Sequence, residues 1–581
     1  MKNLGLGLLL VILAISSVSC DQTRTSDEIG RSDTLIMAFE AGPAPAPYTA
    51  NPFSMTAWYN QGLLQTSMES LFYLNYQTGE SDPWQAKGYE YNTDATELTI
   101  FVREGVRWSD GELFTAEDIA FTLNMLKETA PALWRSDIID TKVESVEVLD
   151  DYTVRIHFAS PEPRFVLDYF SAAISDSIVI IPKHIWEGQD PIVFANFDLE
   201  RGWPVFTGPY LLLSSSETEF VFERDDDWWA AESGFHDLPA PRRLVFTMQG
   251  PEETRAAQLE NGDVDSLTQI SFASFEEAHA RNNAIGAWFD ESPYGWIDPC
   301  PLYLDVNTKT PPWDDPEMRW VLNYAINQER FANVSFEGYG QPAEFLFPNY
   351  PPLQTYLDDN RALFAEFPVL EQNQARAREI LEGRGYFKEG DFYISPEGNT
   401  LEIDLVMMSP DEGGIFWELA TLALVEDLQE IGIKVNSQYL AYGIYFDSGM
   451  TGDYEIRVHW SCGSVVDPYQ TLDRFHSRWV LPIGEAAQNN YSRWSNERYD
   501  QLVDQIGALR PGDPAIRALV DEAMEIWIQE LPAIPLAQQV RIYPYNTTYW
   551  INWPTADNPY TRPQTQDQVT HQTIINLKPA Q

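Results

Sequence analysis

The sequence predicts a mixed α/β protein built from several domains. Segments in which polar and apolar residues alternate, typical of half-buried strands, are interspersed with segments whose apolar residues recur at helical spacing. The length of 581 residues corresponds to several domains at roughly 100–200 residues each. Hydrophobic residues make up 44% of the chain and charged residues 22%, so we expect a packed core and no extensive disorder.

The clearest elements of the first half lie close together in the sequence. Residues 97–102 alternate between polar and apolar side chains and predict a strand. Thr115 precedes Asp118 by three residues, the spacing of a capping box, so we expect a helix to begin at Thr115. Residues 143–158 contain two further alternating runs around an acidic turn, which predicts two more strands.

The second half contains three distinct helix signals. Asp315 followed by Pro316 predicts a helix start, with an acidic N-cap and proline in the first turn. Residues 416–431 predict a long helix that ends at Gly432 and is followed directly by a short strand. Ser495 is expected to begin the last clear helix.

The charge balance excludes one class of function. The chain has 37 Lys and Arg against 88 Asp and Glu, a net charge of −51. Binding to nucleic acid needs clustered basic residues, so no nucleic-acid partner is expected. Contact of the folded body with an anionic membrane surface is disfavoured for the same reason. The acidity fits either a saline habitat or a bias of the lineage.

The N-terminus predicts export and a lipid anchor. Residues 4–18 form an apolar run that is too short to span a membrane, for which roughly 20 residues are needed, but suits a signal peptide. Small residues then lead into Cys20, which resembles the lipobox of bacterial lipoproteins. We therefore expect a signal peptide over residues 1–20, lipidation of Cys20, a flexible tether over residues 21–33, and a location in the periplasm or at the cell surface. The alternative is an ordinary cleaved signal peptide.

The other two cysteines form an even pair. If Cys20 carries lipid, only Cys300 and Cys462 remain in a compartment that favours disulfides. We predict that they are bridged. The alternative is a pair of buried thiols.

No motif of catalysis or cofactor binding is present in the sequence. There is no Gly-Lys dipeptide for a phosphate-binding loop, no His-Glu-x-x-His, no Cys-x-x-Cys and no Gly-x-Ser-x-Gly. The seven histidines lack metal-ligand spacing, and acidic pairs carry little information in so acidic a chain. We expect no enzymatic activity, no cofactor and no metal.

Aromatic residues are abundant, with 19 Trp, 28 Tyr and 30 Phe, and many stand beside amides or glycine in predicted loops. A flat ring can cover the apolar face of a sugar while amides bind its hydroxyls, although packing in a core is the alternative for each ring. These segments are residues 58–61, 294–296, 439–445, Trp460 and residues 489–494.

A family resemblance follows from a long motif. Residues 102–123, VREGVRWSDGELFTAEDIAFTL, resemble the signature of the family 5 extracellular solute-binding proteins, the receptors of ABC importers for peptides, nickel and oligosaccharides. The resemblance covers nearly the whole chain after the leader. Further landmarks in the family's order are residues 207–210, 306–309, 312–315, 323–326 and 531–536.

The resemblance implies a bilobed fold similar to type II periplasmic binding proteins, with mixed sheets, an extra inserted domain and two hinge crossings, near Cys300 and Ala537. It also implies a monomer that closes over a small-molecule ligand and passes it to the transmembrane subunits of a permease. The expected divisions are lobe 1 over residues 34–60, 202–299 and 538–581, an inserted domain over 61–201, and lobe 2 over 300–537.

One departure from the family pattern bears on the ligand. Peptide-binding members carry a Trp-x-x-Asp-x-x-Asp-Pro stretch whose first Asp pairs with the peptide's amino group. The matching stretch here runs from Trp460 to Pro468, and Gly463 or Ser464 stands where that carboxylate belongs. Because a buried ammonium needs a paired carboxylate, we expect an oligosaccharide of the cellobiose or β-glucan kind. The alternatives are a peptide receptor of the same family and, more remotely, a secreted glycoside hydrolase.

The expected ligand-binding residues combine rings with polar groups. The rings are expected to act as stacking platforms, and the others to contact hydroxyls or amides. They are Trp58, Tyr59, Tyr294, Trp296, Trp460 and Trp494 among the aromatics, and Ser464, Asp467 and Asn490 among the polar residues.

Overall fold

The computed structural model describes most of the chain after the leader. The described residues are 29–39, 48–54, 62–75, 79–172, 177–248 and 250–580. Cys20, Trp58 and Tyr59, for which lipidation and ligand binding are expected, lie outside them. No helix within the described ranges is long and apolar enough to cross a membrane.

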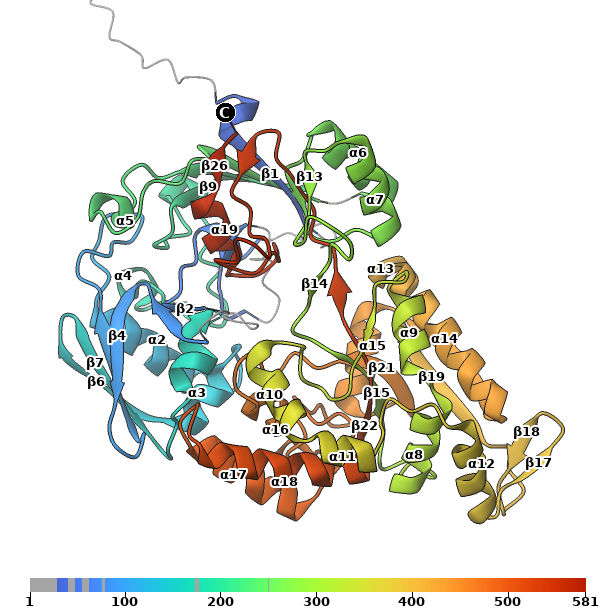
Figure 1. The fold of residues 1–581 in the computed structure, drawn as a ribbon. Helices are drawn as coiled ribbons and strands as arrows, with labels where there is room; N and C mark the ends of the chain where they lie inside the picture. Colours follow the sequence, from blue (N-terminus) through green and yellow to red (C-terminus); the bar gives the residue numbers. More distant parts are fainter. Residues whose placement is uncertain are drawn as a thin grey trace, which may run out of the picture.

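One mixed sheet, at the top of Figure 1, is assembled from segments far apart in the sequence. β1 pairs in parallel with β11 and β12, while β10 lies antiparallel to β9 and β11. We call this sheet with its helices lobe 1. Its strands, in spatial order, are β13 (Ile285–Gly286), β24 (Tyr545–Asn546), β12 (Ser266–Leu267), β1 (Thr34–Phe39), β11 (Arg243–Met248), β10 (Glu219–Arg224) and β9 (Tyr210–Ser215), and the neighbouring helices include α6 (Glu252–Asn261), α7 (Phe272–Arg281) and α19 (Thr570–Asn576).

A four-stranded antiparallel sheet contributes to a further apolar core, which it shares with residues such as Trp228 and Val569, and we call the part of the molecule around this sheet the inserted part. Its strands, in spatial order, are β4 (Ala86–Tyr91), β5 (Glu97–Val102), β7 (Thr153–Phe158) and β6 (Val143–Asp150). α2 (Ala116–Glu128) packs against this sheet, and the Thr115 backbone N–H donates to Asp118 Oδ2 at 2.8 Å. The strands and the capped helix predicted for this region are confirmed.

A second mixed sheet forms the centre of what we call lobe 2. β15 lies antiparallel to β21 and β22, whereas β19 runs parallel to β20 and β21. The predicted mixed α/β class is therefore confirmed. The strands, in spatial order, are β16 (Gln341–Pro342), β22 (Ala533–Gln538), β15 (Leu302–Val306), β21 (Ile456–Trp460), β19 (Glu402–Met408) and β20 (Lys434–Leu440).

The helices predicted for this lobe begin and end largely as expected. α8 (Pro316–Ala325) begins after Asp315, whose side chain accepts from the Glu317 N–H. α14 (Ile415–Ile431) ends at Gly432, which has φ 104°, a left-handed conformation that glycine adopts without steric cost. Other helices of this lobe include α9 (Gln328–Ser335), α12 (Gln374–Gly383) and α15 (Tyr442–Thr451).

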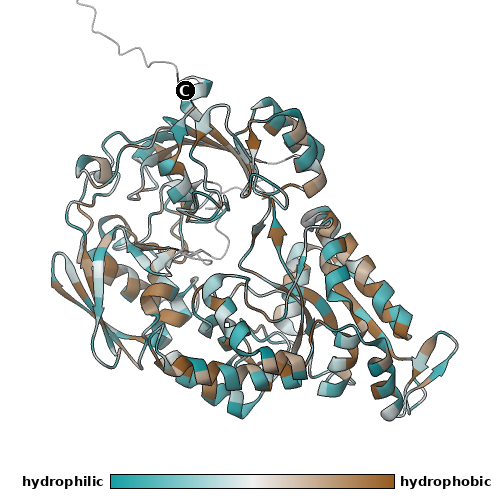
Figure 2. Cartoon of the chain, in the orientation of Figure 1, coloured by the Kyte–Doolittle hydropathy of each residue, from teal (hydrophilic) through white to brown (hydrophobic). Residues whose placement is uncertain are grey.

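Two details of the last helices differ from the prediction. α17 (Glu497–Ala508) is capped by Asn496, not Ser495, because the Asn496 amide oxygen accepts from the Tyr499 N–H. A further long helix, α18 (Ala515–Glu530), follows it and was not predicted. It starts after Pro514 without a side-chain cap, so the usual start signal is missing. Figure 2 shows hydrophobic and hydrophilic residues alternating on α17 and α18.

A short antiparallel ribbon joins the two mixed sheets. β14 (Trp296–Ile297) pairs with β23 (Val540–Arg541), and Figure 1 shows β14 between the two lobes. The chain passes from lobe 1 to lobe 2 after β14 and returns along β23. We call this pair of strands the hinge ribbon. The two crossings of the chain between the lobes thus lie side by side in the hinge ribbon. Adjacent crossings of this kind allow rotation about a hinge.

Candidate ligand-binding site

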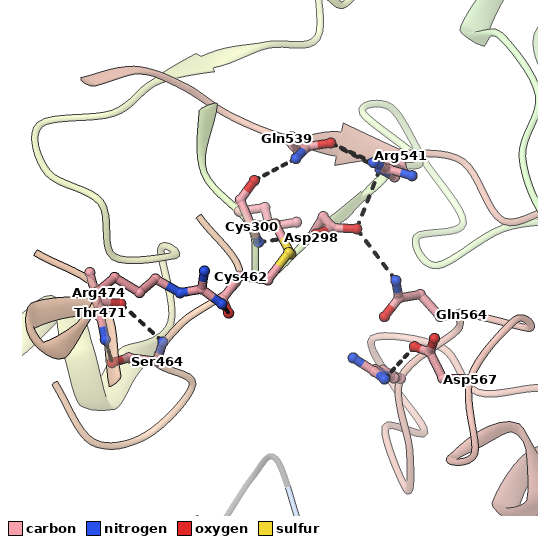
Figure 3. Close-up of a disulfide and its surroundings, with 12 residues drawn as sticks. Asp298, Cys300, Cys462, Ser464, Thr471, Arg474, Gln539, Arg541, Gln564 and Asp567 are labelled. Atoms are coloured by element: carbon pink, nitrogen blue, oxygen red, sulfur yellow. Dashed lines mark hydrogen bonds and ion pairs between the residues drawn. A yellow bond between two sulfur atoms is a disulfide. The ribbon is translucent and has the colours of Figure 1, made fainter. Parts of the chain in front are cut away.

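A disulfide lies beside the hinge ribbon. Cys300 and Cys462 are bonded, with an S–S distance of 2.04 Å and a sequence separation of 162. The Cys300 N–H donates to Asp298 Oδ1 at 3.0 Å, and its carbonyl accepts from Gln539 Nε2 at 2.6 Å. Cys462 follows β21, so the bond ties a loop of lobe 2 to the hinge ribbon (Figure 3).

The lobe 1 side of this region contains a buried carboxylate. Asp298 Oδ2 lies 3.3 Å from Arg541 Nε and accepts from Gln564 Nε2 at 3.4 Å. Burial raises the pKa of Asp298, while the guanidinium groups of Arg541 and Arg562 lower it. Figure 3 shows Gln564 pointing toward Asp298 from a loop near the C-terminus.

A second ion pair balances the charge of this cluster. Arg562, which is almost fully buried, pairs with Asp567. Burial raises the pKa of Asp567, and the pairing with Arg562 lowers it. Two guanidinium groups therefore face two carboxyl groups, Asp298 and Asp567. Each guanidinium group therefore has a carboxyl partner within the protein.

The loop over residues 561–568, which we call the C-terminal loop, also holds buried polar atoms without a partner in the described part of the chain. Gln564 Oε1, Thr565 Oγ1 and Gln566 Oε1 are buried without a hydrogen-bond partner among the described residues. Buried polar atoms normally have partners, so three such atoms in one loop favour a ligand that forms hydrogen bonds here. No residue of this loop was predicted from the sequence to bind ligand, although its run of threonine and glutamine could have indicated it.

On the lobe 2 side, Trp460 ends β21 and is half-buried. Its ring centroid lies 5.5 Å from that of Phe446 and 6.0 Å from that of Trp417. Tyr445 is stacked on it at 6.4 Å. The indole is therefore held in place by aromatic neighbours and retains accessible surface.

The two positions that align with the peptide receptors' carboxylate have structural roles. A Cβ added to Gly463 would lie 2.5 Å from Thr471 Oγ1 and 2.9 Å from Thr471 Cα, so no larger side chain fits. The Ser464 N–H donates to Thr471 Oγ1 at 3.0 Å, and Ser464 Oγ accepts from the Thr471 N–H at 3.1 Å. Arg474 donates to the Cys462 carbonyl at 2.6 Å from the same side (Figure 3). No carboxylate can occupy position 463 in this backbone conformation.

Asp467 forms an ion pair with a residue of the inserted part. Arg164 binds both carboxylate oxygens of Asp467, at 3.0 and 3.1 Å, and the side chains are 3% and 8% exposed. The third nitrogen of Arg164, Nη1, donates to the carbonyls of Ile506 and Gly507 at the end of α17, where a helix dipole favours a cation. The pair therefore joins the inserted part to lobe 2. The sequence predicted Asp467 as a ligand contact but did not indicate its partner Arg164.

A second contact of the same interface involves a carboxyl group that titrates near neutral pH. Gln470 Nε2 donates to Asp168 Oδ1 at 2.5 Å. Burial raises the pKa of Asp168 to about 7, against the opposing effects of Gln470 and Arg164. In the unfolded chain the pKa of this group returns to about 3.9, so between pH 4 and 7 the folded state holds a proton that the unfolded state lacks.

Stability is therefore expected to fall as pH rises through this window, by at most about 1.4 kcal/mol per pH unit from this group. Asp168→Asn keeps the acceptor for Gln470 and removes the titration. Its melting temperature, measured from pH 4 to 7, should decrease less with pH than that of the wild type. Equal slopes would show that Asp168 does not titrate in this range.

The remaining aromatic and amide residues have partners within the chain. Tyr294 packs on Phe275, with ring centroids 5.2 Å apart, and Trp296 is 5% exposed in the hinge ribbon. Asn490 donates to the carbonyls of Phe475, His476 and Trp494. The Trp494 indole N–H donates to Glu530 Oε2 at 2.6 Å, and its ring is 3% exposed. The structure thus gathers Trp460, Ser464 and Asp467 around one loop, and buries Trp494 inside lobe 2.

No group of histidine, cysteine, aspartate and glutamate among the described residues is arranged to hold a metal ion.

A sequence model of bacterial extracellular solute-binding proteins, family 5, matches residues 80–479. This match spans more than half of the chain. The protein is a family 5 solute-binding protein.

Two relatives of this family 5 protein bind peptides according to their names. The glutathione-binding protein GsiB of Escherichia coli strain K12 is 24% identical over 525 residues, which cover 87% of this chain and 90% of GsiB. The oligopeptide-binding protein AppA of Bacillus subtilis, solved with a nonapeptide, is similar in fold with a TM-score of 0.71 at 17% identity, covering 94% and 99% of the two chains.

A third relative of this family 5 protein binds a sugar. The mannohexaose-bound periplasmic oligopeptide-binding protein of Thermotoga maritima matches with a TM-score of 0.78 at 23% identity, covering 95% of this chain and 99% of that one. At these identities the structures establish a shared fold. The family match itself identifies the chain as a bacterial extracellular solute-binding protein.

Proposed function

We propose that this receptor binds an uncharged oligosaccharide between its two lobes, with Trp460 as a stacking platform. The observation that carries this proposal is the loop after Trp460. Gly463 has no room for a side chain, and the Ser464 hydroxyl bonds to Thr471. A peptide's amino group would therefore find no carboxylate at these positions, and an unpaired buried charge costs several kcal/mol.

Two further features support a neutral, hydroxyl-rich ligand. The guanidinium groups of Arg541 and Arg562 are compensated by Asp298 and Asp567. The oxygens of the C-terminal loop that lack a partner among the described residues can form hydrogen bonds with sugar hydroxyls. The Thermotoga structure holds mannohexaose in the same fold, which supports the same ligand class here.

The proposal also covers the export of the protein, its anchoring to a membrane and its partners. After export, Cys20 carries lipid and holds the protein, a monomer, at a membrane in the periplasm or at the cell surface. The ligand is captured by hinge closure and passed to the transmembrane subunits of the permease, with no bond made or broken. The proposal also divides the chain into lobe 1 over residues 34–60, 202–299 and 538–581, an inserted domain over 61–201 and lobe 2 over 300–537.

A peptide receptor is the second candidate, because GsiB is named for glutathione and AppA holds a nonapeptide. A thermal-shift screen separates the two. Mannohexaose and cellohexaose are compared with glutathione and short peptides, each alone, since a ligand at 100 times its dissociation constant stabilises by about 2.7 kcal/mol. Stabilisation by peptides but not by sugars would refute the proposal. Release of shorter sugars during incubation would instead indicate the third candidate, a glycoside hydrolase.

Removing the indole of Trp460 is the test of the platform. Trp460→Ala is expected to weaken oligosaccharide binding by about 1–3 kcal/mol, as for other aromatic stacking platforms. Isothermal titration calorimetry measures the effect. Phe387→Ala, which removes a ring that is 52% exposed on the hairpin strand β17 (Phe387–Glu389), is the matched control and should not change affinity. Unchanged affinity in a folded Trp460→Ala protein would exclude the platform.

A further inference from the structure

The loops that follow three strands of lobe 2 meet at one edge of its sheet. β19 and β20 are parallel, with Met408 opposite Leu440, and β19 is also parallel to β21, which ends at Trp460. The carboxyl ends of these strands therefore lie at the same edge. In α/β sheets, ligands bind outside the carboxyl ends of the strands. The segment after β20 consequently lies on the same side of the sheet as the Trp460 loop.

Tyr442 is the first residue of α15 and stands two positions after the end of β20. Its side chain is 56% exposed, and its ring centroid lies 4.6 Å from that of Phe446. Phe446 in turn lies 5.5 Å from Trp460. Both separations are within the range of direct ring–ring contact. Three rings thus form a continuous row from the half-buried Trp460 outward to the exposed Tyr442.

The helix that carries this row is firmly held. Tyr445, the next turn of α15, is fully buried, and its hydroxyl donates to the Val458 carbonyl of β21. Arg457 of the same strand forms a buried ion pair with Asp305 of β15 at 2.9 Å and lies over the Tyr445 ring at 5.4 Å. Tyr442 is therefore presented by a rigid support, which limits the entropy lost when a ligand stacks on its ring.

We propose that Tyr442 is an outer stacking platform, which binds an additional sugar ring of an oligosaccharide whose inner part is held at Trp460. This inference rests on the proposed function and extends it to ligand length. A short sugar fills the inner site alone. A longer chain continues along the row of rings and gains contact with Tyr442.

The test compares ligands of two lengths. The dissociation constants of mannobiose and mannohexaose, and of cellobiose and cellohexaose, are measured by calorimetry with the wild type, Tyr442→Ala, Tyr442→Phe and Phe387→Ala. Tyr442→Ala is expected to weaken hexaose binding at least about fivefold, the lower limit for loss of one stacked ring, and so to lower the ratio of hexaose to biose affinity. Tyr442→Phe keeps the ring and should retain the wild-type ratio, as should Phe387→Ala.

The possible outcomes distinguish failure of the outer platform at Tyr442 from failure of oligosaccharide binding itself. Unchanged affinities for both biose and hexaose in folded Tyr442→Ala, with sugars still bound by the wild type, overturn the outer platform and leave the proposed function standing. Equal weakening of biose and hexaose would place Tyr442 within the inner site and also overturn it. Failure of every sugar to bind the wild type would refute the proposed function and this inference together. Since Tyr442 is exposed, an unchanged melting temperature is expected for Tyr442→Ala and verifies its fold.

Discussion

Replacing Asp467 by asparagine is expected to destabilise the folded protein by about 3–5 kcal/mol. Arg164 is 3% exposed and binds both oxygens of Asp467. The amide of asparagine has nearly the same shape as the carboxylate but no charge. The guanidinium would remain buried without its counter-charge, and this unpaired charge is the source of the loss.

The melting temperature of Asp467→Asn, measured by calorimetry without ligand, checks this expectation. Arg164→Met combined with Asp467→Leu removes both charges and is the matched control. It should lose less stability than Asp467→Asn, because apolar pairs of similar volume often replace a buried ion pair without loss. A wild-type melting temperature for Asp467→Asn would contradict the structural role. Reduced sugar affinity at unchanged stability would instead favour the ligand contact predicted from the sequence.

The disulfide is the second feature with a large expected effect. The Cys300→Ser, Cys462→Ser double variant is expected to be less stable by about 5 kcal/mol in the chain-entropy treatment, because the bond closes a loop of 162 residues in the unfolded chain. The loop after Trp460 would also lose its covalent link to the hinge ribbon.

Thermal unfolding with and without a thiol reductant measures this effect. The reductant should lower the melting temperature of the wild type toward that of the double variant and leave the variant unchanged. Two buried thiols, the alternative, would give the wild type and the variant the same response to reductant. A loss of sugar affinity in the variant, measured below its melting temperature, would show that the bond also positions the Trp460 loop.

Local signals in the sequence identified several elements correctly. The capping box at Thr115, the Asp315 and Pro316 start, and the stop at Gly432 all act within one or two turns of chain, so they can be recognised without tertiary structure. The N-cap at Asn496 and helix α18 were misjudged because serine and asparagine cap equally well and because Pro514 provides no side-chain cap.

The candidate site was predicted only in part. Trp460 was predicted because it begins the stretch that matches the peptide receptors, and the disulfide because Cys300 and Cys462 form an even pair. The structure brings them together beside the hinge ribbon. The C-terminal loop was missed because Gln564 reaches Asp298 across 266 residues of chain. Arg164 was missed for the same reason, since Asp467 lies 303 residues away.

The sequence by itself predicts the α/β class, the family and the absence of a carboxylate where peptide receptors have one. These properties depend on local periodicity, capping and motif spacing, which act between near neighbours. Tertiary folding decides that Asp467 binds Arg164, that two arginines and two carboxyl groups compensate one another near the hinge, and that Tyr442 continues the row of rings from Trp460. Each of these contacts depends on how strands and loops pack in space, and the energy of a buried charge or a stacked ring is set by that packing.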